Sequence, residues 1–388
     1  MAGSVVLVTG AGALGQNVVY DLALAGVGEI RIVDQDYFEP HNRTRSPLFP
    51  SPEEQEQYGS AKAPTVARKL KPLMTAAGAS VRHAHSWIEA LGDGAFKNVS
   101  AVLACVDKPS ARAYLADKAR LHGIGFIEAG FDGADISLSC FPAVRGEEAG
   151  TTPCWRCSHQ EIEGEGTVFS CLAYARNIAA AGFVPAIQNA AATLAGLQAE
   201  AAILSLHEAM PLPLKFRAMD LNIRSGQSRI ITLLRDPDCP GVHRHLDTAP
   251  TKLTASANDT VSQLLHELND FFGAPARIEL NPGLVWSAAC TNCTEIAEVR
   301  KRVWEWAANS RCEQCDGPFA RTARNGAGSP IIHYYLDSES NEQILNRTCA
   351  EIGFPPLAFV EASAENGPIQ LFEMAGSVEN LFQSGETL

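Results

Sequence analysis

The chain has 388 residues, which is too long for one ordinary core and predicts two domains. Hydrophobic residues make up 46% and charged residues 19%, a balance typical of folded rather than disordered proteins. The formal net charge of -13 argues against nucleic acid as a partner, because a phosphate backbone needs a surface rich in Lys and Arg.

Two features that the sequence lacks argue against a membrane protein and against a secreted protein. No run of about 18 apolar residues is present, so we expect no membrane span. Residues 1–10 lead directly into an apolar strand, without a basic segment or a cleavage site for secretion. We therefore expect a cytoplasmic protein.

The chain opens with the pattern of a Rossmann-like unit. The predicted elements are, in order, a strand at 5–9, the glycine turn Gly10, Gly12 and Gly15, a helix at 16–26, and a strand at 30–33 that ends at Asp34. Further helices are predicted at 62–78 and 110–123, and further strands at 101–105 and 126–129. Strands that alternate with helices predict a mainly parallel sheet covered on both faces.

Beyond residue 130 the pattern changes. Strands with alternating polarity are expected at 136–141 and within 216–234, with an Ala-rich helix at about 183–207 and a loop or lid at 145–170. A polar break at about 236–258 divides the chain. We therefore predict an α/β fold, with a Rossmann-like adenylation domain at 1–248 and a small zinc-containing α+β domain at 249–388.

The glycine turn predicts a phosphate-binding site. Glycines let the backbone approach a phosphate, and the following helix offers free N–H groups to negative charge. Asp34 stands where an acid usually holds ribose hydroxyls. These features fit NAD and ATP equally well, and an ordinary tight turn remains the alternative.

Charged residues downstream favour ATP. Cations at Arg45 and Lys62 suit a triphosphate that is attacked at its α-phosphate, and an acid at Asp107 suits Mg²⁺. A hydride-transfer enzyme has no need of this set. Taken singly, each residue is more often a solvated surface charge.

Together these motifs resemble the ThiF/MoeB/HesA superfamily, which includes the adenylation domains of ubiquitin-activating enzymes. The resemblance covers about residues 4–240 and rests on Gly-Ala-Gly-Ala-Leu-Gly, Val-Asp-Gln-Asp, the Asn42-x-x-Arg45 spacing and Lys62. It implies that Asp34 holds the ribose and Asp107 holds Mg²⁺. The implied ATP-binding set is Gly10, Gly12, Gly15, Asp34, Asp36, Asn42, Arg45, Lys62 and Asp107, with Arg45 and Asp107 catalytic.

One family feature has no counterpart in the sequence. Many relatives carry an arginine, in a helix before the first strand, that reaches the ATP of a partner subunit. Here the first strand is expected at the start of the chain, so either another basic residue takes that role or the phosphate charge is neutralised less strongly.

Six of the eleven cysteines fall in Cys-x-x-Cys pairs. Two of these pairs, Cys290/Cys293 and Cys312/Cys315, have the spacing of a Cys₄ zinc site. A redox role is the alternative. The pair Cys154/Cys157 resembles the first half of the structural zinc site of the family.

The second half of that family site departs from the usual pattern. Cys239 matches one ligand, and the fourth ligand would be His243 or His245, of which we assign His243. A lost site with leftover cysteines is the alternative.

Cys171 lies shortly before the Ala-rich helix. In the family this segment often carries the cysteine that accepts the activated carboxylate, so Cys171 is the predicted acyl acceptor. The alternative is a buried apolar cysteine. Cys105, Cys140 and Cys349 lie in apolar patterns and are expected in the core.

The predicted activity has two steps. The C-terminal carboxylate of a ubiquitin-like or sulfur-carrier-like protein is adenylated with ATP and Mg²⁺, and Cys171 then takes the acyl group as a thioester. The C-terminal domain, which carries a capped helix from Thr260, would recruit a conjugating enzyme, and the resemblance suggests a homodimer. The alternatives are sulfur transfer or peptide modification, a silent adaptor subunit, and an NAD oxidoreductase.

Overall fold

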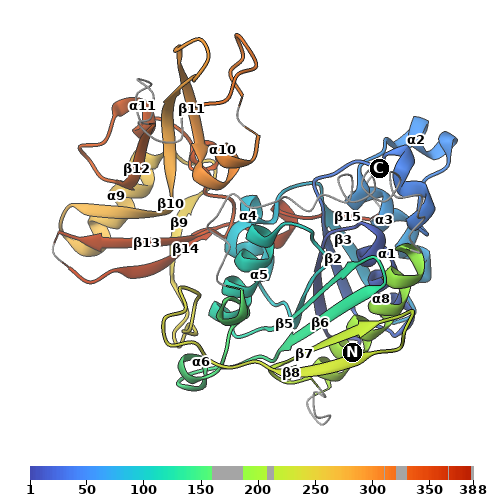
Figure 1. Ribbon diagram of the computed structural model, residues 1–388. Helices are drawn as coiled ribbons and strands as arrows, with labels where there is room; N and C mark the ends of the chain where they lie inside the picture. Colours follow the sequence, from blue (N-terminus) through green and yellow to red (C-terminus); the bar gives the residue numbers. More distant parts are fainter. Residues whose placement is uncertain (160–186, 208–213, 310, 320–329, 366, 386–388) are drawn as a thin grey trace. The chain divides into compact units, whose positions relative to one another are not determined.

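The computed structural model divides the chain into two compact units (Figure 1). One unit comprises Met1–Ile88, Ala95–Thr248 and Phe382–Leu388, and the other comprises Glu89–Gly94 and Ala249–Leu381. The structure describes residues 1–159, 187–207, 214–309, 311–319, 330–365 and 367–385.

The strands of the first unit form one mixed sheet. They are β1 (Val5–Thr9), β2 (Glu29–Val33), β3 (Ser80–Ala84), β4 (Ala101–Ala104), β5 (Gly125–Asp132), β6 (Asp135–Phe141), β7 (Arg217–Asn222), β8 (Ser228–Thr232) and β15 (Gln383–Ser384). Their order among the described residues is β15-β3-β2-β1-β4-β5-β6-β7-β8. Strands β3, β2, β1, β4 and β5 run parallel, and β6 to β8 continue the sheet antiparallel. The predicted Rossmann-like α/β class is confirmed.

Helices cover both faces of this sheet. The described helices of the first unit are α1 (Ala13–Leu24), η1 (Pro40–Arg45), α2 (Pro52–Tyr58), α3 (Lys62–Leu70), η2 (Lys71–Leu73), α5 (Pro109–Leu121), α6 (Glu148–Thr151), η4 (Trp155–Ser158) and α8 (Ile187–Leu206). Two more, α4 (Ile88–Leu91) and η3 (Gly92–Phe96), lie where the chain passes between the units.

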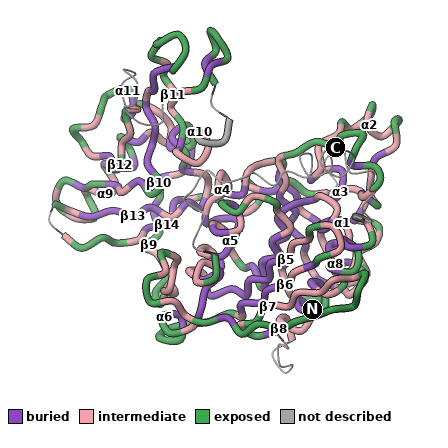
Figure 2. Tube along the Cα trace, in the orientation of Figure 1, coloured by how far each residue is buried: buried purple, intermediate pink, exposed green. Residues whose placement is uncertain are grey.

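The central strands are buried on both sides (Figure 2). Val6 and Val8 belong to the apolar core that α1, α3 and α8 share. Leu7, between them, is also fully buried but lies outside that core, because successive side chains of a strand point to opposite faces. A parallel sheet buried in this way exposes functional groups only at its strand ends.

One predicted helix is shorter than expected. The apolar spacing suggests a helix at 62–78, but α3 ends at Leu70 and is followed by the short η2. Pro72 explains the difference, since proline lacks the N–H that an α-helix needs and clashes with the preceding turn.

The C-terminal segment returns to the first sheet. Strand β15 pairs antiparallel with β3, and Phe382, just before it, is buried with the guanidinium of Arg31 over its ring. Residues 382–385 therefore group with the first unit, whereas the predicted C-terminal domain at 249–388 includes them.

The second unit is an α+β structure with its own core. Its elements are β9 (Thr251–Ser256), α9 (Val261–Phe272), β10 (Ala276–Ala289), β11 (Ile296–Arg302), α10 (Val303–Asn309), β12 (Ile331–Leu336), α11 (Glu342–Leu345), η6 (Ala350–Ile352), β13 (Phe359–Ala364), β14 (Gln370–Ala375) and η7 (Val378–Asn380). The described strands take the order β11-β10-β13-β14-β9, and β12 pairs with β10.

Helix α9 confirms the predicted cap. The side chain of Thr260 accepts a hydrogen bond from the backbone N–H of Gln263, and the Gln263 side chain caps Thr260 in return. Leu264 and Leu268 of this helix are fully buried in the core of the unit.

Among the residues described, no helix has both the length and the apolar character needed to cross a membrane.

Candidate functional site

The predicted nucleotide-binding residues gather at the carboxyl ends of neighbouring parallel strands. Gly10 follows β1, Asp34 follows β2, and Asp107 lies three residues beyond the end of β4. In the sheet β1 lies between β2 and β4. The strands that follow β1 in the chain are thus added first on one side of it, as β2 and β3, and then on the other side, as β4 and β5. Such a switch point is where open α/β sheets bind ligands.

Two glycines of the turn, Gly10 and Gly15, are required by close backbone packing. Gly10 has a φ of +96°, and a Cβ there would lie 2.4 Å from the carbonyl oxygen of Cys105. A Cβ on Gly15 would lie 1.8 Å from the carbonyl oxygen of Gly10. By contrast, a Cβ on Gly12, the N-cap of α1, meets no atom within 4 Å. The first turn of α1 therefore has an open N-terminus, where free N–H groups can meet an anion.

Asp34 fixes the backbone of the glycine turn by accepting a hydrogen bond from it. Its Oδ2 accepts a hydrogen bond from the Ala11 N–H at 2.6 Å, and its Oδ1 accepts one from the Asp36 N–H at 2.7 Å. The pKa of Asp34 is raised above its ordinary value, mainly because the carboxyl is buried. The ammonium of Lys62 and the two N–H donors offset part of this rise. Each oxygen keeps a lone pair, so the carboxylate can also accept from the hydroxyls of a ribose.

Lys62 is held beside this carboxylate. Its Nζ lies 3.1 Å from the carboxylate of Asp36, and its backbone N–H donates to the Asp36 carbonyl at 2.9 Å. The segment with Asp34 and Asp36 and the start of α3 are thereby joined. The Lys62 side chain is only 13% exposed, while the Asp36 side chain is 58% exposed, so a polyphosphate could replace Asp36 as the partner of the ammonium.

The other predicted residues differ in their environments. Asn42 is buried, and its side-chain oxygen accepts a hydrogen bond from the Glu39 N–H at 3.0 Å, which fixes the start of η1. Within the described residues, neither the Arg45 side chain nor the exposed Asp107 side chain has a hydrogen-bond or ion-pair partner. A cation and a carboxylate without partners suit phosphate and Mg²⁺ respectively.

Several buried polar residues around the site carry no motif and were missed. Gln16 is fully buried, donates to the Ala11 carbonyl at 2.9 Å and accepts from the Leu48 N–H at 2.9 Å. Gln198 of α8 donates to the carbonyls of Ala104 and Ile127, joining the end of β4 to the first half of β5. A Gln within the apolar, Ala-rich run of α8 is the sequence signal that could have identified Gln198, because a buried amide requires partners.

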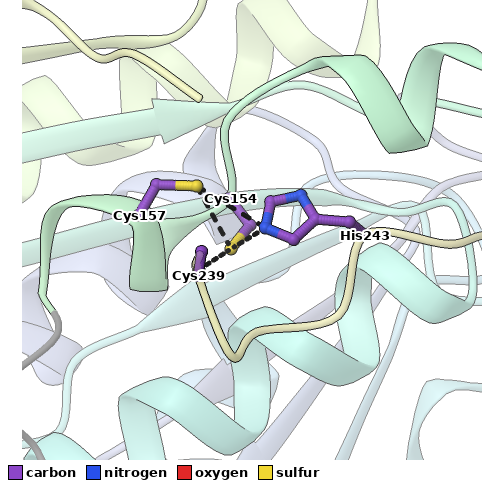
Figure 3. A group of neighbouring side chains, drawn as sticks. All are labelled: Cys154, Cys157, Cys239 and His243. Atoms are coloured by element: carbon purple, nitrogen blue, oxygen red, sulfur yellow. Dashed lines mark hydrogen bonds between the residues drawn. The ribbon is translucent and has the colours of Figure 1, made fainter. Parts of the chain in front are cut away.

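A first side-chain cluster joins residues far apart in the sequence. Cys154 and Cys157 lie at η4, and Cys239 and His243 lie on the segment after β8 (Figure 3). The Sγ of Cys154 is 3.9 Å from the Sγ of Cys157 and 3.7 Å from that of Cys239. The Nε2 of His243 is 3.3 Å and 3.5 Å from the first two sulfurs.

These distances fit a tetrahedral metal. Four ligands at Zn–S distances of about 2.3 Å have neighbouring sulfurs about 3.8 Å apart. The alternative histidine, His245, instead has its Nδ1 3.4 Å from the carboxylate of Asp247. Buried Arg120 hydrogen-bonds Thr152 and Pro153 beside the cluster, and its positive charge would balance a Cys₃His zinc site, which carries a net negative charge.

The second cluster lies in the second unit. The Sγ atoms of Cys290 and Cys315 are 3.5 Å apart, and those of Cys293 and Cys312 are 3.6 Å apart. The two pairs sit in matching turns: the Thr294 N–H donates to the Cys290 carbonyl, and the Asp316 N–H donates to the Cys312 carbonyl. Four thiols grouped in this way can hold zinc.

The remaining cysteines divide into two groups. Cys140 and Cys349 are buried as predicted, and burial raises the pKa of each thiol to about 12. Cys105 is partly buried, and its thiol pKa is likewise raised to about 12 by burial. Such thiols are poor nucleophiles at neutral pH. Cys171, the predicted acyl acceptor, lies outside the described residues.

A cavity of about 590 Å³ lies over the antiparallel part of the first sheet. Its lining comes from β5, β6, β7, the turn after β7 and the start of β8, and it includes Gly130, Phe131, Ile136 and Leu221. Strand β5 connects this cavity to the strand ends that carry the nucleotide-site residues. An extended peptide could lie along it.

Comparison with known proteins identifies the first unit. The ThiF family matches residues 2–241. The chain is 31% identical over 169 residues to an "adenylyltransferase and sulfurtransferase uba4" of Aspergillus niger, a match that covers 43% of this chain and 34% of the relative. The corresponding protein of Yarrowia lipolytica is 31% identical over 152 residues, which is 39% of this chain and 35% of the relative. The matched region thus spans about a third of these relatives.

Among solved structures, Escherichia coli MccB with AMPCPP and MccA is 20% identical, covers 62% of this chain and 67% of MccB, and has a TM-score of 0.46. MccB with ATP gives 20% identity, 62% and 66% coverage, and a TM-score of 0.45. The family match extends over most of the first unit and confirms the resemblance drawn from the motifs. The chain belongs to the ThiF family.

Proposed function

We propose that this protein is an ATP-dependent adenylyltransferase that activates the C-terminal carboxylate of a ubiquitin-like or sulfur-carrier-like protein. The observation that carries the proposal is the convergence of the glycine turn, Asp34, Lys62 and Asp107 at one edge of a parallel sheet. Membership of the ThiF family and relatives named adenylyltransferases support it.

Each residue has a role in this proposal. Asp34 accepts from the ribose, the N-terminus of α1 faces the phosphates, and Arg45 and Lys62 balance their charge. Asp107 would hold Mg²⁺, which supplies further positive charge at the phosphates when bound. A carboxylate oxygen of the acyl protein attacks the α-phosphorus, and pyrophosphate leaves.

The acyl protein needs a place for its C-terminal tail. The cavity over β5, β6 and β7 has a volume of about 590 Å³, and Gly130 in its wall lies beside Arg112, which hydrogen-bonds Val106 next to Asp107. We propose that the tail lies there with its carboxylate directed toward the nucleotide. Holding both reactants in line would supply much of the rate gain.

The second step is a thioester on Cys171. The thiolate attacks the carbonyl carbon of the acyl-adenylate and AMP leaves, so the acyl group stays activated. The other cysteines either group in the two clusters or have raised pKa values, which leaves Cys171 as the best acceptor.

Further features suggest partners. Strand β8 lies at an edge of the sheet with all five residues exposed, and Ile230 and Leu234 are 59% and 74% exposed. We propose that a second copy of the chain covers this edge in a homodimer. In the second unit, the exposed Tyr334 and Tyr335 of β12 offer a surface to a conjugating enzyme. The proposed setting is the cytoplasm.

A second candidate is adenylation for sulfur transfer. The relatives named adenylyltransferase and sulfurtransferase favour it, although they match only part of this chain. The first step and its residues would be the same. The fate of the acyl group separates the two, because a sulfur-transfer pathway need not pass through Cys171.

Exchange of pyrophosphate into ATP tests the first step. With Mg²⁺ and a small protein that ends in glycine, the wild type should catalyse exchange, and Asp107→Asn should lower its rate on the order of 100-fold by removing the metal ligand. Asp270→Asn is the matched control, since it neutralises an exposed carboxylate of the second unit. Full exchange in Asp107→Asn would exclude the role proposed for this residue.

A thiol-sensitive adduct tests the second step. Cys171→Ala should retain exchange but lose the adduct on a non-reducing gel, because no acceptor thiol remains. Cys349→Ala should retain the adduct, since that thiol is buried and has a raised pKa. An adduct that survives in Cys171→Ala would assign the acceptor elsewhere, and a wild type without any adduct would favour sulfur transfer.

We also propose zinc in both cysteine clusters. Elemental analysis of the purified protein should find two zinc ions per chain, because both sets of ligand atoms lie within 4.8 Å of one another. Cys157→Ser and Cys293→Ser should each lose one ion and keep the other. A wild type with one ion would mean that only one cluster binds zinc, and a wild type with none would contradict both assignments.

A further inference from the structure

Arg112 holds the turn that carries Asp107. It lies in the first turn and a half of α5, five residues beyond Asp107, and its guanidinium points back along the chain. Its Nη2 donates to the carbonyl oxygen of Val106 at 2.6 Å. Val106 directly precedes Asp107, so this bond fixes the last peptide group before the proposed metal ligand.

That peptide group lies beyond the sheet ladder. Strand β4 ends at Ala104, and its last pairing with β5 joins Ala104 to Glu128. The Cys105 N–H still donates to the Thr9 carbonyl at 2.8 Å. Past this point Arg112 supplies the bond to the turn, and without it the direction of the Asp107 carboxylate would depend on a short unpaired segment.

A buried carboxylate holds the guanidinium in place. Nη1 of Arg112 forms a short ion pair with Glu128 of β5, whose side chain is only 8% exposed. Two charges at such a position are costly to desolvate, so a pair of this kind adds little stability compared with apolar side chains of similar size. The ion pair instead fixes the position of the Arg112 guanidinium.

The neighbouring strand leaves room for this arrangement. A Cβ on Gly130 would lie 3.1 Å from Nη2 and 3.4 Å from Nη1 of Arg112. Gly130 also lines the cavity over β5, β6 and β7. The guanidinium is thus packed against β5 between that cavity and the Asp107 turn.

We propose that Arg112, held by Glu128, is a positioning residue for the metal ligand Asp107. The proposal rests on the proposed function, in which Asp107 holds the Mg²⁺ of the nucleotide. Arg112 touches neither the nucleotide nor the metal in this account. It acts through the Val106 carbonyl, as the outer partners of metal ligands orient those ligands.

The test compares nucleotide binding with and without the metal. A non-hydrolysable ATP analogue is titrated into the full chain by calorimetry, once with Mg²⁺ and once with EDTA. Arg112→Gln should weaken binding with Mg²⁺ on the order of tenfold and leave binding in EDTA within about twofold, because only the metal ligand is misplaced. Glu128→Gln should shift binding in the same direction by less, since the amide can still accept a hydrogen bond.

Arg31→Gln is the matched control. Arg31 is another buried arginine of the same sheet, paired with Glu29 at 2.6 Å and bonded to the carbonyls of Ala95 and Lys97. Its loss should lower the unfolding temperature without changing the ratio of the two affinities. If Arg112→Gln does not fold, Gly130→Ala keeps the arginine but adds a Cβ 3.1 Å from its Nη2, so the guanidinium must shift slightly, and the variant should change the same ratio by less.

Asp107→Asn separates the possible failures. If Asp107→Asn loses the effect of Mg²⁺ and neither Arg112→Gln nor Gly130→Ala does, the positioning role is overturned and the proposed function stands. If Asp107→Asn itself binds with Mg²⁺ as the wild type does, the metal role of Asp107 fails, and the positioning role fails with it. Loss of binding in EDTA as well as in Mg²⁺ would also overturn the proposal, because it would indicate general disruption.

Discussion

The nucleotide site depends on one close contact between two backbone segments. The turn after β1 passes so near the end of β4 that a Cβ on Gly10 would lie only 2.4 Å from the carbonyl oxygen of Cys105. Only glycine, which also accepts the positive φ, can occupy this position without displacing β4. The contact brings the open end of α1 and the turn with Asp107 to the same place, so one ligand can meet both.

Helix α5 connects this place with the first cysteine cluster. It begins two residues after Asp107, and near its other end Asp117 accepts a hydrogen bond from the Val242 N–H at 3.0 Å. Val242 lies next to His243 of the cluster. Arg120, on the same helix, binds the segment that leads to Cys154. A metal in that cluster would therefore help to fix the helix that begins just after Asp107.

The sequence was sufficient for the features that depend on local pattern. Gly10 and Gly15 after an apolar run predict a phosphate-binding turn, because the physical requirement and the residue type lie at one place. Thr260 with Gln263 predicts a helix start for the same reason. The Cys-x-x-Cys spacing predicts the grouping of thiols within each pair, since a short turn determines how near the two sulfurs can come.

Features that depend on distant contacts were not predictable in this way. Nothing local distinguishes His243 from His245 as the companion of Cys154; the packing of the segment after β8 makes that choice. Glu128 gave a partial signal, because a charge within an apolar strand must find a partner, but only the fold identifies Arg112 as that partner. Phe382 was assigned to the other domain, since its burial beside Arg31 follows from the return of the chain.

The central claim is that these strand ends form a single site for ATP and Mg²⁺. A crystal structure with a non-hydrolysable ATP analogue and Mg²⁺ tests it most directly. The account predicts the ribose at Asp34, the phosphates over the N-terminus of α1, and the metal within ligand distance of Asp107. A nucleotide bound elsewhere on the chain, or bound here with its metal on the far side from Asp107, would contradict it.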